Sequence, residues 1–323
     1  MIEKVIPTPD DDNPNPREYE LLSDGTYRMT MDTLHGGFCY DLDYKDGTVS
    51  EMIGFERMDD GYSAAIYQGE GRVVIPREYN GAPVTEIVQP HYPEEAGVSE
   101  ITEVVIPDTV RCIGSEALQY YTALTRVNIP DSVRSIGDYA FGGDTSLTEI
   151  RLPSTIERVG IGCFSGCTAL RQVELPASLE VIDAHAFYEC GALESVMIPR
   201  AVTTISCDAF CFCESLSSIE VDAENTTYIS KDGNLFSDGG RTLVRYAPAK
   251  ADGEFSVPAE VLSIGELAFD GASSLLRVVL PSGLTAVGEA AFICCDSLRE
   301  VTLPKGAAIG DAAFPENVSL ILL

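Results

Sequence analysis

Hydrophobic and polar residues recur along most of this chain with a fixed period, and prolines mark that period. Five prolines stand 23 residues apart, and three more keep the same spacing after a gap: Pro107, Pro130, Pro153, Pro176 and Pro199, then Pro258, Pro281 and Pro304. Before each proline, aliphatic residues alternate with mostly polar ones, which predicts a short β-strand with one buried face. The proline ends the strand because it has no amide hydrogen to donate. A repeat of this length predicts a stacked solenoid with one turn of the coil, here called a rung, per repeat.

The repeat around Pro153 indicates which positions face the core of the coil. Ile150 and Leu152 alternate with charged residues, so their side chains are expected to point inward. Gly160 is expected to permit a tight bend, because glycine leaves the backbone unrestricted. Phe164 is expected to fill the middle of the coil and to stack on the equivalent residue of each neighbouring rung. The predicted column, with Leu118 at its head, is Phe141, Phe164, Phe187, Phe210, Phe269, Phe292 and Phe314.

The segments outside the regular repeats predict additions to this solenoid. Residues 1–18 are rich in Pro, Asp and Asn and predict an extended arm. Residues 19–75 contain strand-like runs separated by turn residues, which predict a small antiparallel β cap over the first rung. The solenoid is then expected over residues 76–323. Within it, residues 222–257 lack the expected proline and predict a divergent unit that contains a β-hairpin.

The repeated phrase resembles the BspA-type leucine-rich repeats of bacterial surface proteins. One complete example of the shared pattern is Ile129-Pro130, Ile136-Gly137, Ala140-Phe141 and Leu147, and the resemblance covers about residues 71–320. It implies a right-handed leucine-rich-repeat solenoid of about nine 23-residue rungs, with a parallel β-sheet on one face and short strands and short helical or irregular turns opposite. It also implies a non-enzymatic, adhesin-like module that binds an as yet unidentified protein.

Charge narrows the classes of partner. The chain has 51 acidic and 21 basic residues, a formal net charge of −30, and the excess is spread evenly along the sequence. Such a field repels phosphate backbones and anionic lipid, so nucleic acid is not an expected partner, and basic partners or divalent cations are favoured. No apolar run is long enough to span a membrane, so no membrane insertion is expected. The N-terminus lacks a secretory signal, which favours the cytoplasm, whereas the family resemblance favours the cell surface or secretion.

The sequence contains no recognisable catalytic motif. Its histidines, His35, His91 and His185, occupy unrelated repeat positions, and no nucleophile elbow, zinc-protease or phosphate-binding glycine motif is present. Residues 41–51 loosely match a calcium loop, but a β-turn accounts for them better. We therefore expect no enzymatic activity, no metal and no cofactor.

Four cysteines occupy one repeat position, 14 residues after their prolines: Cys167, Cys190, Cys213 and Cys295. Three interpretations are open. Stacked thiols could form disulfides, if neighbouring Cα atoms lie ~4.4–6.8 Å apart. They could also bind zinc, although their spacing differs from that of zinc knuckles. We favour a ladder of reduced, buried thiols, because free cysteine behaves as a small hydrophobic residue.

The outward face of the predicted sheet is the candidate binding surface. Its two columns of residues, two and four positions before each proline, contain no aromatic residue. Opposite charges on adjacent rungs, such as Glu103 and Arg126, favour solubility and cross-strand pairing. The alternative is a protein-binding patch on the middle rungs, formed by Arg126, Asn128, Glu149, Arg151, Gln172, Glu174, Ser195 and Met197.

The C-terminal residues suggest a second hypothesis. Residues 315–323 begin another rung, with Leu320 and Leu323 in register and no polar cap after them. An uncovered coil end favours association with another chain. The alternative function is therefore an intracellular structural or self-associating scaffold, with a homodimer formed through this uncapped rung.

Overall fold

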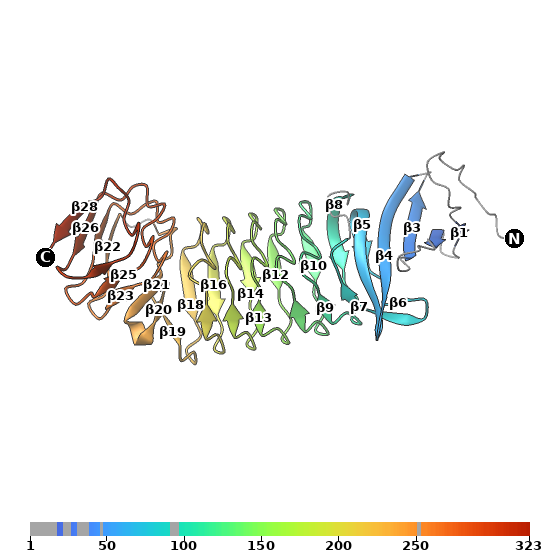
Figure 1. The fold of residues 1–323 in the computed structure, drawn as a ribbon, viewed down its shortest axis with the longest axis horizontal. Coiled ribbons are helices and arrows are strands. Elements are labelled where there is room, and N and C mark those ends of the chain that lie inside the picture. Colours follow the sequence, from blue (N-terminus) through green and yellow to red (C-terminus); the bar gives the residue numbers. More distant parts are fainter. Residues whose placement is uncertain (1–17, 22–26, 31–38, 46–47, 91–96, 251–252) are drawn as a thin grey trace.

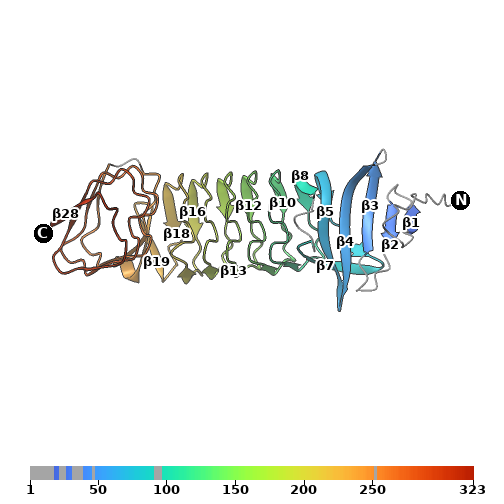
Figure 2. The same ribbon diagram turned by 45° about the horizontal axis from the view of Figure 1, so that its top comes forward.

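The structure is a computed structural model, and it describes residues 18–21, 27–30, 39–45, 48–90, 97–250 and 253–323. The chain forms an elongated solenoid, with the cap at one end and the last strand at the other (Figures 1 and 2). Within the described ranges, the regular elements are β-strands and one short 3-10 turn, η2 (Asp238–Gly240). The predicted arm lies almost entirely outside these ranges.

The N-terminal cap is an antiparallel sheet, as predicted. Its strands follow one another in chain order: β1 (Glu18–Leu21), β2 (Tyr27–Thr30), β3 (Cys39–Lys45), β4 (Thr48–Met58) and β5 (Gly61–Val74). Strand β5 also pairs in parallel with β7 (Ala82–Ile87) and β8 (Gly97–Val105), the first strands of the solenoid. Cap and solenoid therefore share one strand and one core, in which Ile66 and Val73 are fully buried.

Each rung contributes one strand to each of two stacks. After β8, the sheet face continues with β10 (Arg126–Asn128), β12 (Glu149–Arg151), β14 (Gln172–Glu174), β16 (Ser195–Ile198), β18 (Ser218–Val221), β22 (Glu254–Ser256), β24 (Arg277–Val279), β26 (Glu300–Leu303) and β28 (Ser319–Leu322). Counted on this face, the solenoid has about eleven rungs rather than nine, because β5 and β28 each add one. All ladders between these strands are parallel.

The opposite stack consists of short strands, most of them two residues long. After β7, which forms a hairpin with β6 (Glu78–Tyr79), they are β9 (Cys112–Ile113), β11 (Ser135–Ile136), β13 (Arg158–Val159), β15 (Val181–Ile182), β17 (Thr204–Ile205), β23 (Ser263–Ile264), β25 (Ala286–Val287) and β27 (Ala308–Ile309). This confirms the predicted short strands opposite the sheet. The connections between the stacks are hydrogen-bonded turns rather than helices over the described rungs.

The predicted phenylalanine column forms the centre of the coil. Ring centroids of successive residues lie 5.5 Å apart for Phe141 and Phe164, and 5.4 Å apart for Phe164 and Phe187. The column ends with Phe292 and Phe314, 5.1 Å apart. These rings are nearly parallel because the rungs repeat the same backbone at the spacing of neighbouring strands.

Gly160 has a different role from the one that the repeat predicts. Its φ is not positive, so a left-handed bend does not require glycine here. A Cβ atom at this position would instead lie 2.6 Å from Asp138 Oδ1 on the preceding rung. A side chain at this position would displace the Asp138 carboxylate, which accepts a hydrogen bond from Ile161 N.

The divergent unit at 222–257 is a three-stranded meander. Strands β19 (Tyr228–Lys231) and β20 (Asn234–Ser237) form a hairpin, closed by Asp232 and Gly233 with φ of 50° and 70°. Strand β20 then pairs antiparallel with β21 (Thr242–Arg245), which joins the short-strand stack through β23. The unit interrupts the sheet face, and the rungs after it are turned relative to those before it (Figures 1 and 2).

Candidate interaction surface

The structure brings the eight predicted residues together on one outward face. Strands β10, β12, β14 and β16 present them side by side, and all eight are exposed. Glu149 lies opposite Gln172 and Arg151 opposite Glu174, in the predicted 23-residue register. Arg151 Nε and Glu174 Oε2 are 3.4 Å apart, and both side chains are largely exposed. Met197 is 54% exposed and is the one large apolar side chain in the group.

Asn128 is committed to the fold rather than to a ligand. Its Oδ1 accepts a hydrogen bond from Ile106 N at 3.3 Å, and its Nδ2 donates to Ile106 O at 3.4 Å. The side chain thus satisfies the backbone of the preceding rung where the strand ladder stops at Val105. Seven of the eight predicted residues then remain for contact with a partner.

The sheet face is hollowed at its middle rungs. A shallow depression of about 340 Å³ is lined by Thr148, Glu149, Arg171, Gln172 and Glu194. Only two of these residues belong to the predicted columns. The other three occupy the position five residues before a proline, which also faces outward where the chain enters the strand. That position is recognisable in the sequence, since it is polar in each of the five consecutive repeats.

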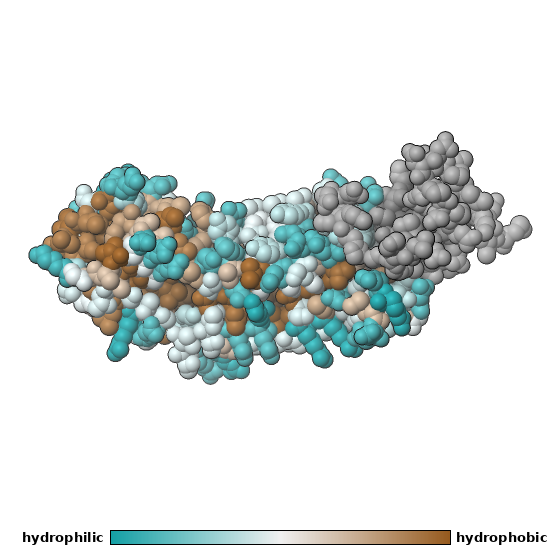
Figure 3. Space-filling model, viewed as in Figure 1, coloured by the Kyte–Doolittle hydropathy of each residue, from teal (hydrophilic) through white to brown (hydrophobic). Residues whose placement is uncertain are grey.

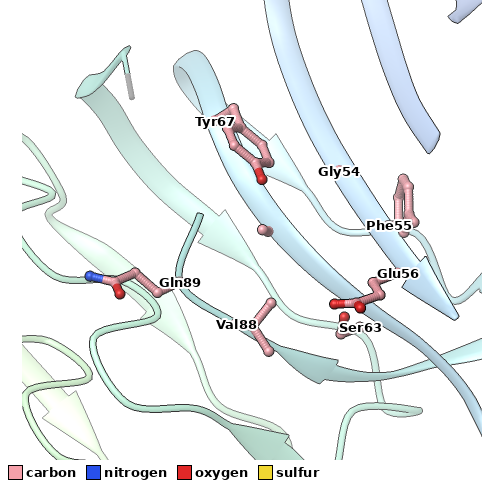
Figure 4. Close-up of a pocket in the computed structure, with 8 residues that line it drawn as sticks. Gly54, Phe55, Glu56, Ser63, Tyr67, Val88 and Gln89 are labelled. Carbon is pink, nitrogen blue, oxygen red and sulfur yellow. The ribbon is translucent and has the colours of Figure 1, made fainter. Parts of the chain in front are cut away.

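A second, much smaller pocket of about 10 Å³ lies where the cap meets the first rung (Figure 4). Phe55 and Glu56 from β4, Ser63 and Tyr67 from β5, and Val88 and Gln89 after β7 line it. Gln89 is already engaged, because its Nε2 donates to a carboxylate oxygen on the next rung at 2.8 Å. Across the described residues there is no group of three or more His, Cys, Asp and Glu side chains placed to hold a metal ion.

The stacked cysteines form a ladder of hydrogen-bonded thiols. Cys167 Sγ donates to Phe141 O at 3.1 Å, and Cys190 Sγ donates to Phe164 O at 3.2 Å. Cys213 and Cys295 repeat this contact with the phenylalanine 26 residues earlier. Burial raises the pKa of Cys213 and of Cys295 to about 12, so these thiols stay protonated and unreactive. All four are free cysteines, which favours the reduced ladder over a structural disulfide.

Asp144 occupies the same repeat position one rung before Cys167. Its side chain is fully buried, and its Oδ1 accepts a hydrogen bond from Tyr121 N at 2.8 Å. Its Oδ2 has no hydrogen-bond partner among the described residues. Burial raises the pKa of Asp144 well above its usual range, despite the hydrogen bond from Tyr121. A carboxylic acid therefore stands where the next rungs carry a thiol.

The turns that lead from each short strand to the next sheet-face strand stack into a continuous border, here called the turn edge. Its segments are 114–124, 137–147, 160–170, 183–193, 206–216, 265–275, 288–298 and 310–318. Backbone bonds join successive segments, from Tyr120 N to Gly142 O (2.8 Å), Gly143 N to Ser165 O (2.7 Å) and Gly166 N to Tyr188 O (2.8 Å). These donors have positive φ, which turns their N–H groups toward the next rung.

The charged residues of the turn edge are acidic, apart from His185 when it is protonated. Its segments contain 13 Asp and Glu residues and no Lys or Arg. Asp144 and Asp270 are buried, whereas Asp183 pairs with Arg158 from the short-strand stack and Asp208 with His185. The arginines of the repeats lie instead on the sheet face and around the short strands. The excess of acidic residues is thus even along the sequence but uneven around the coil.

Aromatic side chains line the same edge. Tyr120 is 63% exposed. Two rungs contribute a cluster in which the ring centroids of His185 and Tyr188 are 5.0 Å apart and those of Tyr188 and Phe212 5.1 Å, both edge to face. Partial burial, and then the carboxylate of Glu189, raise the pKa of Tyr188, so its phenol is neutral. His35 and His91 lie outside the described residues.

A buried ion pair connects the parts of the turn edge that precede and follow the divergent unit. Asp270 Oδ2 accepts from Phe212 N at 3.0 Å and from Arg245 Nη2 at 3.0 Å. Arg245 also donates to Phe210 O and Leu267 O, both at 2.8 Å. Both charged side chains are almost completely buried, at 3% and 1% exposure. This pair replaces the backbone bond that links the other rungs, and nothing in the repeat pattern identified it.

The sequence matches the BspA type leucine rich repeat region in six copies, over residues 96–217 and 253–321. These ranges make up more than half of the chain, which therefore belongs to the BspA-type leucine-rich repeat family. No curated protein matches the sequence. No helix in the described part of the chain is long and apolar enough to cross a membrane.

Solved bacterial structures share this fold. The pneumococcal vaccine antigen PcpA aligns with a TM-score of 0.68 at 22% identity, covering 84% of this chain and 80% of its own. A leucine rich cell surface protein from Faecalibacterium prausnitzii aligns with a TM-score of 0.57 at 26% identity, covering 82% and 89%. A leucine-rich repeat protein from Eubacterium ventriosum aligns with a TM-score of 0.59 at 23% identity, covering 85% and 70%. This chain is thus a repeat protein that resembles bacterial surface proteins.

Proposed function

We propose that this protein is a non-enzymatic binding module that holds a partner protein on the sheet face of its middle rungs. One observation carries the proposal: β10, β12, β14 and β16 present an exposed, hollowed face that no other described part of the chain covers. Solenoids characteristically bind through such extended surfaces. The resemblance to a cell surface protein of F. prausnitzii supports an adhesin-like role outside the cell.

The composition of this face indicates the kind of contact. Its ion pairs are exposed, so each contributes only about 0.2–1 kcal/mol to stability, and breaking them to contact a partner costs little. Met197 provides an apolar anchor among the polar groups, and methionine adapts to irregular partner surfaces. A polar rim around one apolar contact is typical of non-obligate protein interfaces.

Binding to protein extracts tests the assignment of this face. The face variant combines Arg151→Glu with Met197→Glu, and a matched control combines Arg134→Glu with Leu262→Glu, both exposed and off the face. We expect wild type and control to retain the same partner from host-cell surface extracts, and the face variant to lose it. Equal retention by both variants, or the absence of any retained protein, would contradict the proposal. Antibody labelling of intact cells tests the location separately, and an epitope reached only after lysis contradicts the surface role.

A self-associating scaffold is the second candidate, because the last rung exposes core positions. Leu320 and Leu322 lie opposite the buried Val301 and Leu303, so Leu322 rather than Leu323 is in register with Leu320. They are nevertheless 47% and 57% exposed. Figure 3 shows apolar residues gathered at this end of the molecule.

Light scattering distinguishes the two candidates. If copies associate through the last rung, the protein is a homodimer at micromolar concentration, and Leu320→Glu with Leu322→Glu returns it to a monomer. A wild-type monomer at 100 μM or more, roughly the upper range of such measurements, would remove the scaffold candidate.

A further inference from the structure

We propose that the turn edge is a second docking surface, separate from the sheet face, and that it binds an extended, arginine- or lysine-rich segment of a partner polypeptide. The surface centres on the aromatic cluster of His185, Tyr188 and Phe212, with Glu189 and Glu214 beside it on the same two rungs.

The charges of the edge select a cationic partner. Glu189 and Glu214 are exposed, and no ion pair of the described residues includes either of them. Most acidic residues of the sheet face differ, since Glu174, Glu254 and Glu300 each pair with an arginine of a neighbouring strand, although Glu149 does not within the described residues. An unpaired row of one sign attracts the opposite sign and repels its own. The partner must therefore supply the missing cations.

The aromatic rings make the same selection by a different interaction. The face of a tyrosine or phenylalanine ring carries negative potential and attracts a guanidinium or ammonium group. The Tyr188 phenol is neutral and partly exposed, and Tyr120 on an earlier rung is 63% exposed. Rings and carboxylates that alternate along one edge offer an arginine both a flat face and an anion.

The spacing of the edge fits an extended chain. Four rung intervals separate Tyr120 from Phe212, which at ~4.8 Å per interval gives ~19 Å. About six residues of extended polypeptide cover that length at ~3.3 Å each. Two rungs lie between the two aromatic groups, 137–147 and 160–170, and the second has glycine at both positive-φ positions, Gly162 and Gly166, and carries no charge. The ring of Tyr139 on the preceding rung occupies the space beside Gly162, so an aromatic side chain also lies between the two groups.

Fluorescence anisotropy with a defined probe tests this surface. The probe is a fluorescein-labelled octapeptide in which Arg alternates with Ser, and the matched neutral peptide carries Gln in place of Arg. The edge variant is Glu189→Gln with Glu214→Gln. The control is Glu157→Gln with Glu180→Gln, two exposed residues beside the short strands, which changes the net charge by the same amount away from both surfaces.

We expect the wild type to bind the arginine peptide and not the glutamine peptide, and to bind more weakly as salt rises from 50 to 300 mM. The edge variant should raise the Kd about 5–10-fold, whereas the control should change it less than about twofold. Tyr188→Leu should weaken binding about threefold while keeping the apolar contact.

Equal weakening by the two charge variants would show that net charge alone attracts the peptide and would overturn the proposal. So would an unaffected edge variant, binding of the neutral peptide, or a wild type that does not bind. The thermal unfolding temperature, measured for each variant, separates loss of binding from loss of fold.

Discussion

The sheet face and the turn edge are built from the same rungs, yet their electrostatics differ. On the sheet face, side chains from strands 23 residues apart lie opposite one another, and arginines alternate with acidic residues. On the turn edge, backbone bonds and buried groups join the rungs, and the exposed side chains are free of that pairing. The repeat therefore dictates the backbone of both surfaces and the charge of neither. Substitutions on the sheet face should consequently lower the stability of the protein little, whereas substitutions of the buried groups that join the rungs at the turn edge should lower it much more.

The largest loss of stability is expected at the buried ion pair of Arg245 and Asp270, which connects the turn edge on the two sides of the divergent unit. Arg245→Met leaves Asp270 buried without its cation, and Asp270→Leu leaves the guanidinium without its anion. Each should lower the free energy of unfolding by about 3–5 kcal/mol, measured by urea denaturation. The double variant should be less destabilised than the sum of the two, because it leaves no unpaired charge. Strictly additive losses would mean that the two groups do not interact.

The next largest loss of stability is expected for a substitution at a glycine of the turn edge. Gly137→Ala would place a Cβ atom 2.3 Å from Ser115 N on the preceding rung, and a backbone atom cannot move aside. We expect the free energy of unfolding to fall by about 1–3 kcal/mol. The sheet face should keep the same exposed residues. Gly191→Ala is the matched control, because no heavy atom lies within 4 Å of the added carbon. Comparable losses of stability in the two variants would mean that the glycine-to-alanine change acts through backbone conformation rather than through the contact with Ser115.

Asp144 should make stability depend on pH. Because its pKa is raised in the folded protein, unfolding releases its proton above the ordinary aspartate pKa, and stability falls as pH rises through that window. Asp144→Asn keeps an acceptor for Tyr121 N and removes the titration. The free energy of unfolding of the variant should rise relative to that of the wild type by up to about 1.4 kcal/mol per pH unit above about pH 4, and the difference should be independent of pH below it. Parallel stability curves from pH 4 to 8 would show that this acid does not titrate in the window.

The smallest effect is expected on the sheet face. A double-mutant cycle on Arg151 and Glu174 should yield a coupling below about 0.5 kcal/mol, because both side chains are largely exposed. The coupling should fall further in 0.5 M salt. A coupling above 1 kcal/mol would mean that exposed ion pairs also stabilise the sheet face, and the contrast with the buried ion pair of the turn edge would disappear.

Much of the fold was predictable because the repeat fixes distances. Residues one period apart are neighbours in space, so the phenylalanine column, the sheet-face columns and the opposite short strands all follow from counting. The candidate site was predictable only in part. Counting places Glu149 and Gln172 on the hollowed face but omits Thr148, Arg171 and Glu194, because their position lies where the chain enters the strand and outside the two alternating columns.

What the sequence determined by itself is the period, and with it the strands, the core column and the sheet-face register. Only the tertiary structure decided what happens where the period breaks. Tyr246 takes the place in the column next to Phe269, with ring centroids 5.2 Å apart, and Asp270 reaches Phe212 across 58 residues. The physical reason is that an insertion of irregular length resets the register, so its contacts depend on how the chain closes around a packed core. The segregation of charge to one edge also became visible only when the turns were stacked.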